Sequence, residues 1–225
     1  MTKVDDKMYV EYINHMGNDL TVVNAARVSF SKESSWEGAP IGAVLKEKDA
    51  KLVDYLAKHG HWSPFSHCFM QFRIKAPIFV ARQLAKHQVG LSWNEVSRRY
   101  VDEEPVFYIP PSWRGRAANV KQGSTEEGLV NSSLITKEIY PFYDEFLYNY
   151  QFLLNEGVAP EQARMILPQS TYTEWYWSGS LYAFARVCKQ RLDSHAQKET
   201  QEVAEHISEV AKDLFPVSWN ALLSQ

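Results

Sequence analysis

The 225-residue chain has a formal net charge of −3, and hydrophobic side chains make up 45% of it. This size predicts one domain over residues 1–225 that buries its core without disulfides or structural metals, and the negative charge argues against a general nucleic-acid binder. The two cysteines are far apart, no apolar signal segment opens the chain and no apolar run is as long as a membrane span, so we expect a cytoplasmic protein that does not insert into membranes.

The first half of the sequence predicts a small sheet accompanied by short helices. Its expected elements are a strand at 9–13, a helix at 20–29 capped by Asp19, a surface loop at 31–48, an amphipathic helix at 49–59 closed by Gly60, and strands at 69–76 and 104–109. The strand at 69–76 is the clearest, because apolar and polar residues alternate along it with the period of a half-buried strand. Pro77 suits the first position of the helix that follows.

The second half predicts mainly helices. A polar loop at 114–127 precedes helices at 128–155, 160–167, 180–192 and 194–214, with Pro141 marking a kink or a break in the first of them. A small mixed or antiparallel sheet in the N-terminal half, with long helices in the C-terminal half, is an α+β arrangement.

Several familiar site motifs are absent from the sequence. It has no GxGxxG, no P-loop, no HExxH, no GxSxG and no CxxC pair. His59, His61 and His67 raise the question of a zinc site, but their spacing is loose and no fourth ligand lies beside them. We therefore expect no metal, and we expect His59 at the C-terminus of a helix.

Residues 83–100 are dense in groups that recognise a phosphate and a polar base. Arg98 and Arg99 offer planar guanidinium forks, Ser97 a hydroxyl and Glu95 a carboxylate. The alternative interpretation is a solvated, charged helix face. A catalytic serine is disfavoured, because no histidine and aspartate partners lie nearby in the sequence.

Arg164 and Arg191 lie in predicted helices rich in apolar residues, where an unpaired guanidinium would be costly. Each is expected to pair either with an internal carboxylate, such as Asp193 for Arg191, or with an anionic ligand. The aromatic run of Tyr172, Trp175, Tyr176 and Trp177 is typical of a core, and stacking on a ligand ring is the alternative.

Taken together, six segments resemble the flavin-dependent thymidylate synthases in content and order. They are AARVSF (25–30), HGHWSPFSH (59–67), KAPIFVARQ (75–83), SWNEVSRRY (92–100), ARMILP (163–168) and LDSHAQKE (192–199). The resemblance implies a homotetramer of α+β subunits with active sites shared between subunits. It also implies conversion of dUMP to dTMP, with methylene-tetrahydrofolate as carbon donor and NAD(P)H-reduced FAD as hydride donor.

The resemblance further implies roles for individual residues. Arg191 would be catalytic, placed against the uracil ring. The residues that match the dUMP site are Gln83, Lys86, Glu95, Ser97, Arg98, Arg99, Tyr100, Arg164 and Arg191. The residues that match the FAD site, which is not of the Rossmann type, are His61, Ser63, Lys86, His87, Gln88, Glu95, Ser180, Tyr182 and Arg186.

The sequence departs from the family pattern mainly on the FAD side. The usual Arg-His-Arg triplet is Lys86-His87-Gln88 here, which keeps one cation without a bidentate fork and loses the other. Ser66 stands where glutamate is usual. Two alternatives therefore stay open: a non-catalytic nucleotide-binding descendant of the family, and a thymidylate synthase with a cysteine nucleophile. The second is disfavoured, because Cys68 and Cys188 both resemble small buried hydrophobes.

Overall fold

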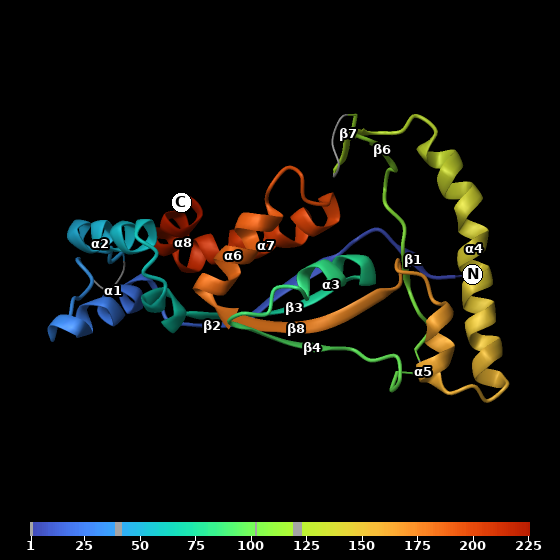
Figure 1. Ribbon diagram of the computed structural model, residues 1–225, viewed down its shortest axis with the longest axis horizontal. Helices are drawn as coiled ribbons and strands as arrows, with labels where there is room; N and C mark the ends of the chain where they lie inside the picture. Colours follow the sequence, from blue (N-terminus) through green and yellow to red (C-terminus); the bar gives the residue numbers. More distant parts are fainter. Residues whose placement is uncertain (1, 39–41, 102, 119–122) are drawn as a thin grey trace.

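A four-stranded antiparallel sheet forms the centre of the molecule (Figure 1). The computed structural model describes residues 2–38, 42–101, 103–118 and 123–225. The sheet consists, in spatial order, of β2 (Tyr9–Met16), β3 (Phe69–Pro77), β8 (Tyr172–Ser180) and β4 (Leu91–Glu95). β3 and β8 are the two inner strands of the sheet, and they are paired along their full lengths.

Side-chain alternation gives the sheet one buried face and one open face. On the buried face, Phe72 and Ile74 of β3 lie opposite Trp177 and Trp175 of β8, and all four are almost completely inaccessible to solvent. Trp93 of β4 stacks on Trp175 with 4.4 Å between ring centroids. Burying a large apolar side chain contributes about 1.5–3 kcal/mol, so this face supplies much of the stability of the fold. The intervening residues of β3 and β8, which are polar or more exposed, form the open face: Gln71, Arg73, Lys75, Glu174, Tyr176 and Ser178.

Helices α3 (Ile78–Leu84), α6 (Leu181–Arg191) and α7 (Lys198–Leu214) lie over the buried face (Figure 1). Phe184 of α6 meets the rings of Phe72 and Trp177 edge-on, at centroid distances of 5.3 and 5.2 Å. α6 begins directly after β8, and the Ser180 hydroxyl accepts a hydrogen bond from Ala183 N at 3.2 Å. That cap satisfies one of the free amides at the start of the helix.

One end of the sheet carries α1 (Asp19–Arg27), α2 (Glu47–Lys58) and α8 (Pro216–Leu223), with the 3₁₀ turns η1 (Val28–Phe30) and η2 (Ser63–His67). Asp19 links α1 to α8 there, because its carboxylate accepts hydrogen bonds from the amides of Val217 and Ser218 at 3.0 and 2.8 Å. Buried Asp49 pairs with Arg27 and accepts from Ser34 Oγ at 2.5 Å, which ties the loop after η1 to both helices.

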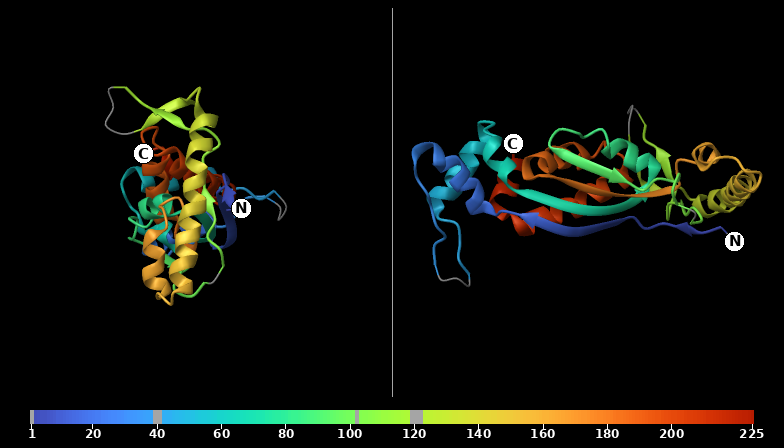
Figure 2. Two further views of the ribbon diagram at one scale, coloured as in Figure 1. Left: turned by 90° about the vertical axis from the view of Figure 1, so that its right-hand side faces the viewer. Right: turned by 90° about the horizontal axis from the view of Figure 1, so that it is seen from below.

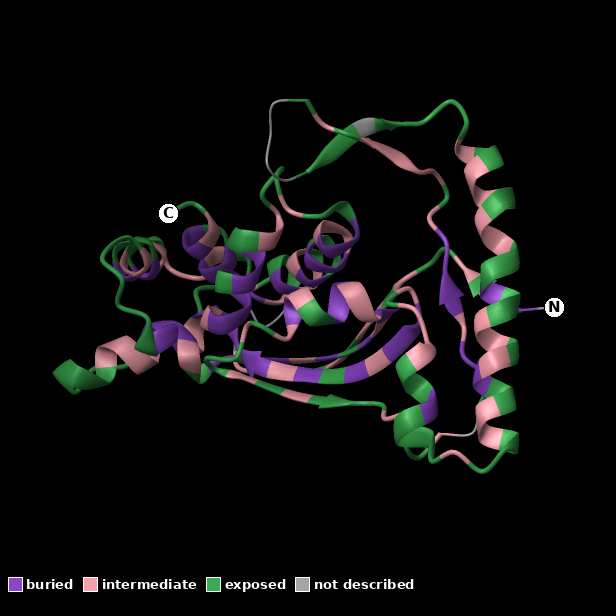
Figure 3. Cartoon of the chain, turned by 45° about the vertical axis from the view of Figure 1, so that its right-hand side comes forward, coloured by how far each residue is buried: buried purple, intermediate pink, exposed green. Residues whose placement is uncertain are grey.

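The long helix α4 (Ser132–Asn155) stands across the other end of the sheet (Figure 2, left). Nearby are the parallel pair β1 (Val4–Asp5) and β5 (Phe107–Tyr108), the hairpin of β6 (Arg114–Arg116) and β7 (Ser124–Gly128), and α5 (Pro160–Ala163) with η3 (Arg164–Ile166). Phe107, Ile109 and Tyr143 form a second, smaller core. Most of α4 remains exposed or half-buried (Figure 3). No helix in the described part of the chain is both long and apolar enough to cross a membrane.

The α+β class and many local predictions are confirmed. The strands predicted at 9–13 and 69–76 correspond to β2 and β3, and the helices at 20–29, 49–59 and 180–192 to α1, α2 and α6. Gly60 ends α2 with a φ of +69°, a conformation that favours glycine. His59 is the C-cap of that helix, as expected. The core interpretation also holds for Trp175 and Trp177, while Tyr176 is 45% exposed.

The largest error concerns β8, which belongs to the half of the chain predicted to be helical. The sheet is therefore not a feature of the N-terminal half alone, because one of its two inner strands comes from residues 172–180. Residues 91–95 are also a strand, so the interpretation of this segment as a charged helix face is wrong.

Smaller corrections concern the ends of elements. Asn18, not Asp19, caps α1, accepting from Thr21 N at 3.1 Å. Pro77 ends β3 and precedes α3, and α4 continues through Pro141. The helices predicted at 128–155 and 194–214 begin later, at Ser132 and Lys198, and the one at 160–167 is only α5 and η3. The loop predicted at 114–127 contains the β6–β7 hairpin, with residues 119–122 outside the described part; residues 39–41 of the loop predicted at 31–48 also lie outside it.

The close approach of β4 to β8 at Gly179 gives a test of the sheet packing. A Cβ atom at this position would lie 2.5 Å from both Gly90 O and Leu91 Cδ2. Gly179→Ala should therefore lower the free energy of unfolding by about 1–3 kcal/mol, measured by urea denaturation. Ser92→Ala, at an exposed position of β4, is the matched control and should change stability little. Equal stability of the Gly179 variant and wild type would contradict this packing.

Candidate functional site

A cavity of about 410 Å³ lies where the end of α3, the α6–α7 connection and the β6–β7 hairpin meet. Gln83 of α3 and Arg191 of α6 form one part of its wall. The remaining lining residues are Arg114, Gly123, Ser124, His195, Ala196 and Gln197. Three segments far apart in the sequence thus surround one polar space.

Arg191 is held at two points beside this cavity. Its Nε donates to His87 Nε2 at 3.0 Å, and its Nη2 donates to the backbone carbonyl of Gln83 at 3.1 Å. Burial lowers the pKa of Arg191, but a guanidinium remains protonated throughout the physiological range. A guanidinium has five N–H donors, so the groups not used in these two bonds can serve a ligand. The expected pairing of Arg191 with Asp193 is not what these bonds show, and Asp193 instead contacts His195 Nδ1 at 3.0 Å.

His87 accepts the Arg191 hydrogen bond, so its Nε2 carries no proton in this arrangement. Burial, followed by the positive charges of Arg191 and Arg186, lowers the pKa of His87 below its usual value. The neutral imidazole then has its proton on Nδ1. The environment therefore favours the form of His87 that the contact with Arg191 requires.

A chain of polar contacts that begins at Gln83 fixes the hairpin to α7. Gln83 Nε2 donates to Gln197 Oε1 at 2.5 Å, and Gln197 Nε2 donates to Glu199 Oε2 at 3.0 Å. The buried Glu199 also accepts from Arg114 Nη2 at 2.6 Å, and Arg114 Nε donates to Ser124 Oγ at 2.9 Å. Sequence reasoning missed Arg114, Gln197 and Glu199. The available signal for Gln197 and Glu199 was the family-like segment at 192–199, from which no site residue was selected.

Other predicted nucleotide-site residues follow β4. Glu95 accepts from Thr173 Oγ1 at 2.7 Å and from Trp93 Nε1 at 3.0 Å. Arg99 Nε donates to Ser97 Oγ at 3.1 Å, and its guanidinium carbon lies 4.9 Å from the centre of the exposed Tyr100 ring. These contacts keep the side chains of Ser97, Arg99 and Tyr100 together just after the end of β4.

Arg98 lies in a different small cavity, of about 180 Å³, whose wall includes Lys75 and Glu174 from the open face of the sheet. It donates from Nη1 to the carbonyl of Glu103, while its buried Nε has no hydrogen-bond partner in the described part of the chain. Burial lowers the pKa of Arg98. Arg164 is exposed in η3. Within one chain, the structure thus brings Gln83, His87 and Arg191 together but leaves Arg98 beside the other face of the sheet.

Most of the predicted FAD-site residues are at the surface. His61 is exposed, with its ring 6.0 Å from the Tyr55 ring in a stacked arrangement, and the half-buried Tyr182 lies 6.2 Å from the exposed Trp62 ring. Four further members of the set are also exposed: Ser63, Lys86, Gln88 and Arg186. Ser180 differs, because it is buried and its hydroxyl caps α6.

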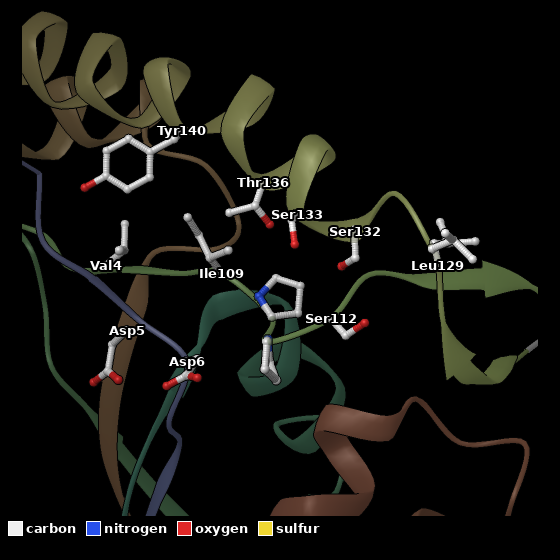
Figure 4. A pocket seen from close by; sticks show the side chains of 13 residues that line it. Val4, Asp5, Asp6, Ile109, Ser112, Leu129, Ser132, Ser133, Thr136 and Tyr140 are labelled. Atoms are coloured by element: carbon white, nitrogen blue, oxygen red, sulfur yellow. The ribbon is translucent and has the colours of Figure 1, made fainter.

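A larger cavity, of about 660 Å³, lies between the N-terminal segment and α4 (Figure 4). Asp5, Asp6, Thr136 and Tyr140 contribute polar groups to it, together with apolar side chains such as Val4. None of the predicted site residues lines this cavity. The smaller cavity is lined by the predicted site residues Gln83 and Arg191, and we therefore take it as the candidate site.

The structure also tests chemistry based on a thiol or a metal. Cys68 and Cys188 are completely buried, and burial raises the pKa of Cys68 to about 12 and that of Cys188 likewise upward. Neither thiol is available as a thiolate near neutral pH. In the described residues, no three His, Cys, Asp or Glu side chains are grouped closely enough to hold a metal ion.

The fold and this site together define an α+β protein in which a guanidinium fixed by two hydrogen bonds lines a polar cavity. Comparison with known proteins gives the family. The family model described as "Thymidylate synthase complementing protein" matches residues 11–217. The flavin-dependent thymidylate synthase of Thermosipho africanus is 37% identical over 98% of this chain and 93% of its own length. That of Thermotoga neapolitana is 39% identical over 97% and 92%. The chain therefore belongs to the flavin-dependent thymidylate synthase family.

A solved structure extends the similarity to the whole fold. The UMP/dUMP methylase PolB from Streptomyces cacaoi, in its complex with 5-Br dUMP, has a TM-score of 0.84 and 31% sequence identity. The comparison covers 99% of this chain and 97% of the PolB chain. The elements surrounding the candidate site thus belong to an architecture that PolB shares.

The Arg114–Glu199 ion pair gives a test of how the hairpin is attached. Arg114→Met leaves a nearly buried carboxylate without its cation, which should lower the free energy of unfolding by about 3 kcal/mol in urea denaturation. Lys51→Met removes an ion pair to Glu47 between highly exposed side chains and should cost less than about 1 kcal/mol. Equal effects of the two substitutions would show that the pair at Glu199 does not anchor the hairpin.

Proposed function

We propose that this protein is a flavin-dependent thymidylate synthase. It converts dUMP to dTMP, with methylene-tetrahydrofolate as carbon donor and NADPH or NADH as the source of reducing equivalents. The observation that carries the proposal is Arg191, held by His87 and Gln83 at the wall of a polar cavity in a chain of this family. FAD, when bound, supplies the hydride that completes the methyl group.

The role of Arg191 is to stabilise negative charge on the uracil ring. The reaction replaces the hydrogen at C5 of the base with a methyl group, and electron density accumulates on the ring as the new carbon–carbon bond forms. A guanidinium already fixed in place can stabilise this charge without reorganisation and without giving up a proton. Arg191 meets both conditions, since it remains charged and two of its donors are held by protein acceptors.

The rest of the dUMP site comes from residues at the end of β4, from η3 and from the segment that follows α3. Ser97, Arg98, Arg99 and Tyr100 supply hydroxyls and cations suited to a phosphate, with Arg164, Glu95 and Lys86 as further contacts. The Nε of Arg98, which has no hydrogen-bond partner among the described residues, supports an anionic ligand at that position. Because Arg98 lies beside the open face and Arg191 among the helices of the other face, one complete site needs residues from two subunits. We therefore propose a homotetramer with active sites at subunit interfaces.

The predicted FAD residues fit a flavin nucleotide in their chemistry. Exposed aromatic and imidazole rings at His61 and Tyr182 can pack on a flat ring system, and Lys86 and Arg186 can pair with a pyrophosphate. Ser63, Gln88, His87 and Glu95 add hydrogen-bonding groups. Ser180 contributes by fixing the first turn of α6, since its hydroxyl is already bound. The site is not of the Rossmann type, in keeping with the antiparallel sheet.

A second candidate function is nucleotide binding without catalysis. Lys86 and Gln88, which stand where the family has arginines, favour this candidate because they weaken the cationic character of the FAD side. The cavity at Arg191 favours catalysis, because the residues that hold the guanidinium are intact.

Arg191→Ala tests the proposed reaction. Wild-type protein in an anaerobic mixture with FAD, NADPH, methylene-tetrahydrofolate and dUMP should form dTMP, measured by mass spectrometry. The variant should be slower by about a hundredfold or more, because a fixed charge-stabilising donor is lost.

Two controls make this test specific. Lys212→Ala, an exposed cation on α7, should retain the wild-type rate, and a parallel reaction with UMP measures selectivity for the deoxynucleotide. A folded wild-type protein that binds dUMP and forms no dTMP would refute the methylase and support the non-catalytic candidate.

Replacing both cysteines with alanine tests the alternative thiol mechanism. Because both thiols are buried and protonated, the double variant should form dTMP at close to the wild-type rate. The native protein should also react slowly with a thiol reagent until it is unfolded in urea. Loss of all activity in a folded double variant would instead support a cysteine nucleophile.

A further inference from the structure

We propose that His87 is a positioning residue, which fixes the guanidinium of Arg191 for nucleotide binding only while its Nε2 carries no proton. This inference rests on the proposed function, in which Arg191 contacts the base. It adds a role to His87, whose resemblance-based assignment concerned only the flavin. The evidence is the pair of hydrogen bonds that Arg191 makes with the loop and helix of residues 83–87.

Because the hydrogens of a guanidinium have fixed directions, these two bonds determine which hydrogens of Arg191 are left for a ligand. Nε has a single hydrogen, and that hydrogen is donated to His87 Nε2 at 3.0 Å. Nη2 donates one hydrogen to the Gln83 carbonyl at 3.1 Å, so the edge formed by Nε and Nη2 is occupied by the protein. The edge formed by Nη1 and the second Nη2 hydrogen makes no hydrogen bond to the described residues, and such an edge can bind two acceptors of a ligand in the cavity that Arg191 lines.

Protonation of His87 would remove this arrangement. A hydrogen on Nε2 would face the Arg191 Nε–H, replacing a hydrogen bond with two like charges at the same distance. The charged groups around His87 reinforce this effect. Arg186 and Arg191 act on it from α6, Lys86 precedes it in the chain, and Arg114 lines the cavity next to Arg191, where the only titratable imidazole among the described lining residues is that of His195.

The neighbouring carboxylates do not compensate for these cations at His87. Glu199 pairs with Arg114, and Asp193 contacts His195. Burial, followed by the charges of Arg191 and Arg186, lowers the pKa of His87, so the contact should persist through neutral pH and fail only under acidic conditions.

The experiment compares two substitutions that separate hydrogen bonding from titration. His87→Gln retains an acceptor near the position of Nε2 but cannot gain a proton, whereas His87→Ala removes the acceptor. His206→Gln is the matched control, because His206 is exposed on α7 and its nearest ionic partner is Glu209. The affinity of each FAD-containing protein for dUMP would be measured by titration calorimetry from about pH 5 to about pH 8.

The expected results differ between the variants. The affinity of wild type and of His206→Gln should fall as the pH decreases. His87→Gln should bind dUMP as wild type does near neutral pH but show a smaller fall in acid. His87→Ala should bind about ten- to a hundredfold more weakly at neutral pH, since a hydrogen bond to a charged group is lost. The phosphate of dUMP also titrates in acid, so wild type and His87→Gln must be compared at each pH.

Two outcomes would overturn the positioning role: wild-type affinity in His87→Ala, or an unchanged acid dependence in His87→Gln. Failure of the proposed function would look different. A wild-type protein that forms no dTMP but shows the predicted affinities would refute the methylation and leave the positioning of Arg191 supported. A wild-type protein with no affinity for dUMP would refute both.

Discussion

The register between β3 and β8 determines where the site forms. The two strands are antiparallel along their full lengths, and each continues directly into a helix, β3 into α3 and β8 into α6. The helices therefore start at opposite ends of the sheet and run back over its buried face. At 1.5 Å per residue they are about 10 and 16 Å long, against about 30 Å for the paired strands. Their C-terminal ends consequently meet above the middle of the sheet, which places Arg191 beside Gln83 and His87.

This meeting of helix ends also explains why an arginine is stable there. The last carbonyls of a helix lack partners within the helix, and the carbonyl of Gln83 at the end of α3 receives the Nη2 hydrogen of Arg191. The C-terminal ends of helices carry partial negative charge, which suits a guanidinium better than a carboxylate would. Arg191 thus satisfies a structural need of α3 with one edge and keeps the other edge available. The same side chain serves the fold and the site.

Local patterns in the sequence were sufficient for β3, α2 and α6, because alternation and helical periodicity are visible within a few residues. They were insufficient for β8, since aromatic residues occupy both of its faces, Trp175 toward the core and Tyr176 toward solvent, which hides the alternation. Its partner β3 also lies about a hundred residues earlier. The site shows the same division. The resemblance identified Gln83, His87 and Arg191, but the hydrogen bonds of Arg191 to the other two, and the pairing of Arg114 with Glu199, depend on long-range packing.

The same sheet that brings Arg191 and Gln83 together separates them from Arg98. Lys75 and Glu174, which line the small cavity of Arg98, alternate with the buried residues of β3 and β8 and so project from the opposite face. A side chain cannot reach through a close-packed layer containing Phe72, Trp175 and Trp177. In the proposed function, a nucleotide whose base contacts Arg191 therefore takes its phosphate contacts from the Arg98 region of another subunit. Sharing the site between subunits would then be a consequence of the strand order, and each subunit would contribute one part to each of two sites.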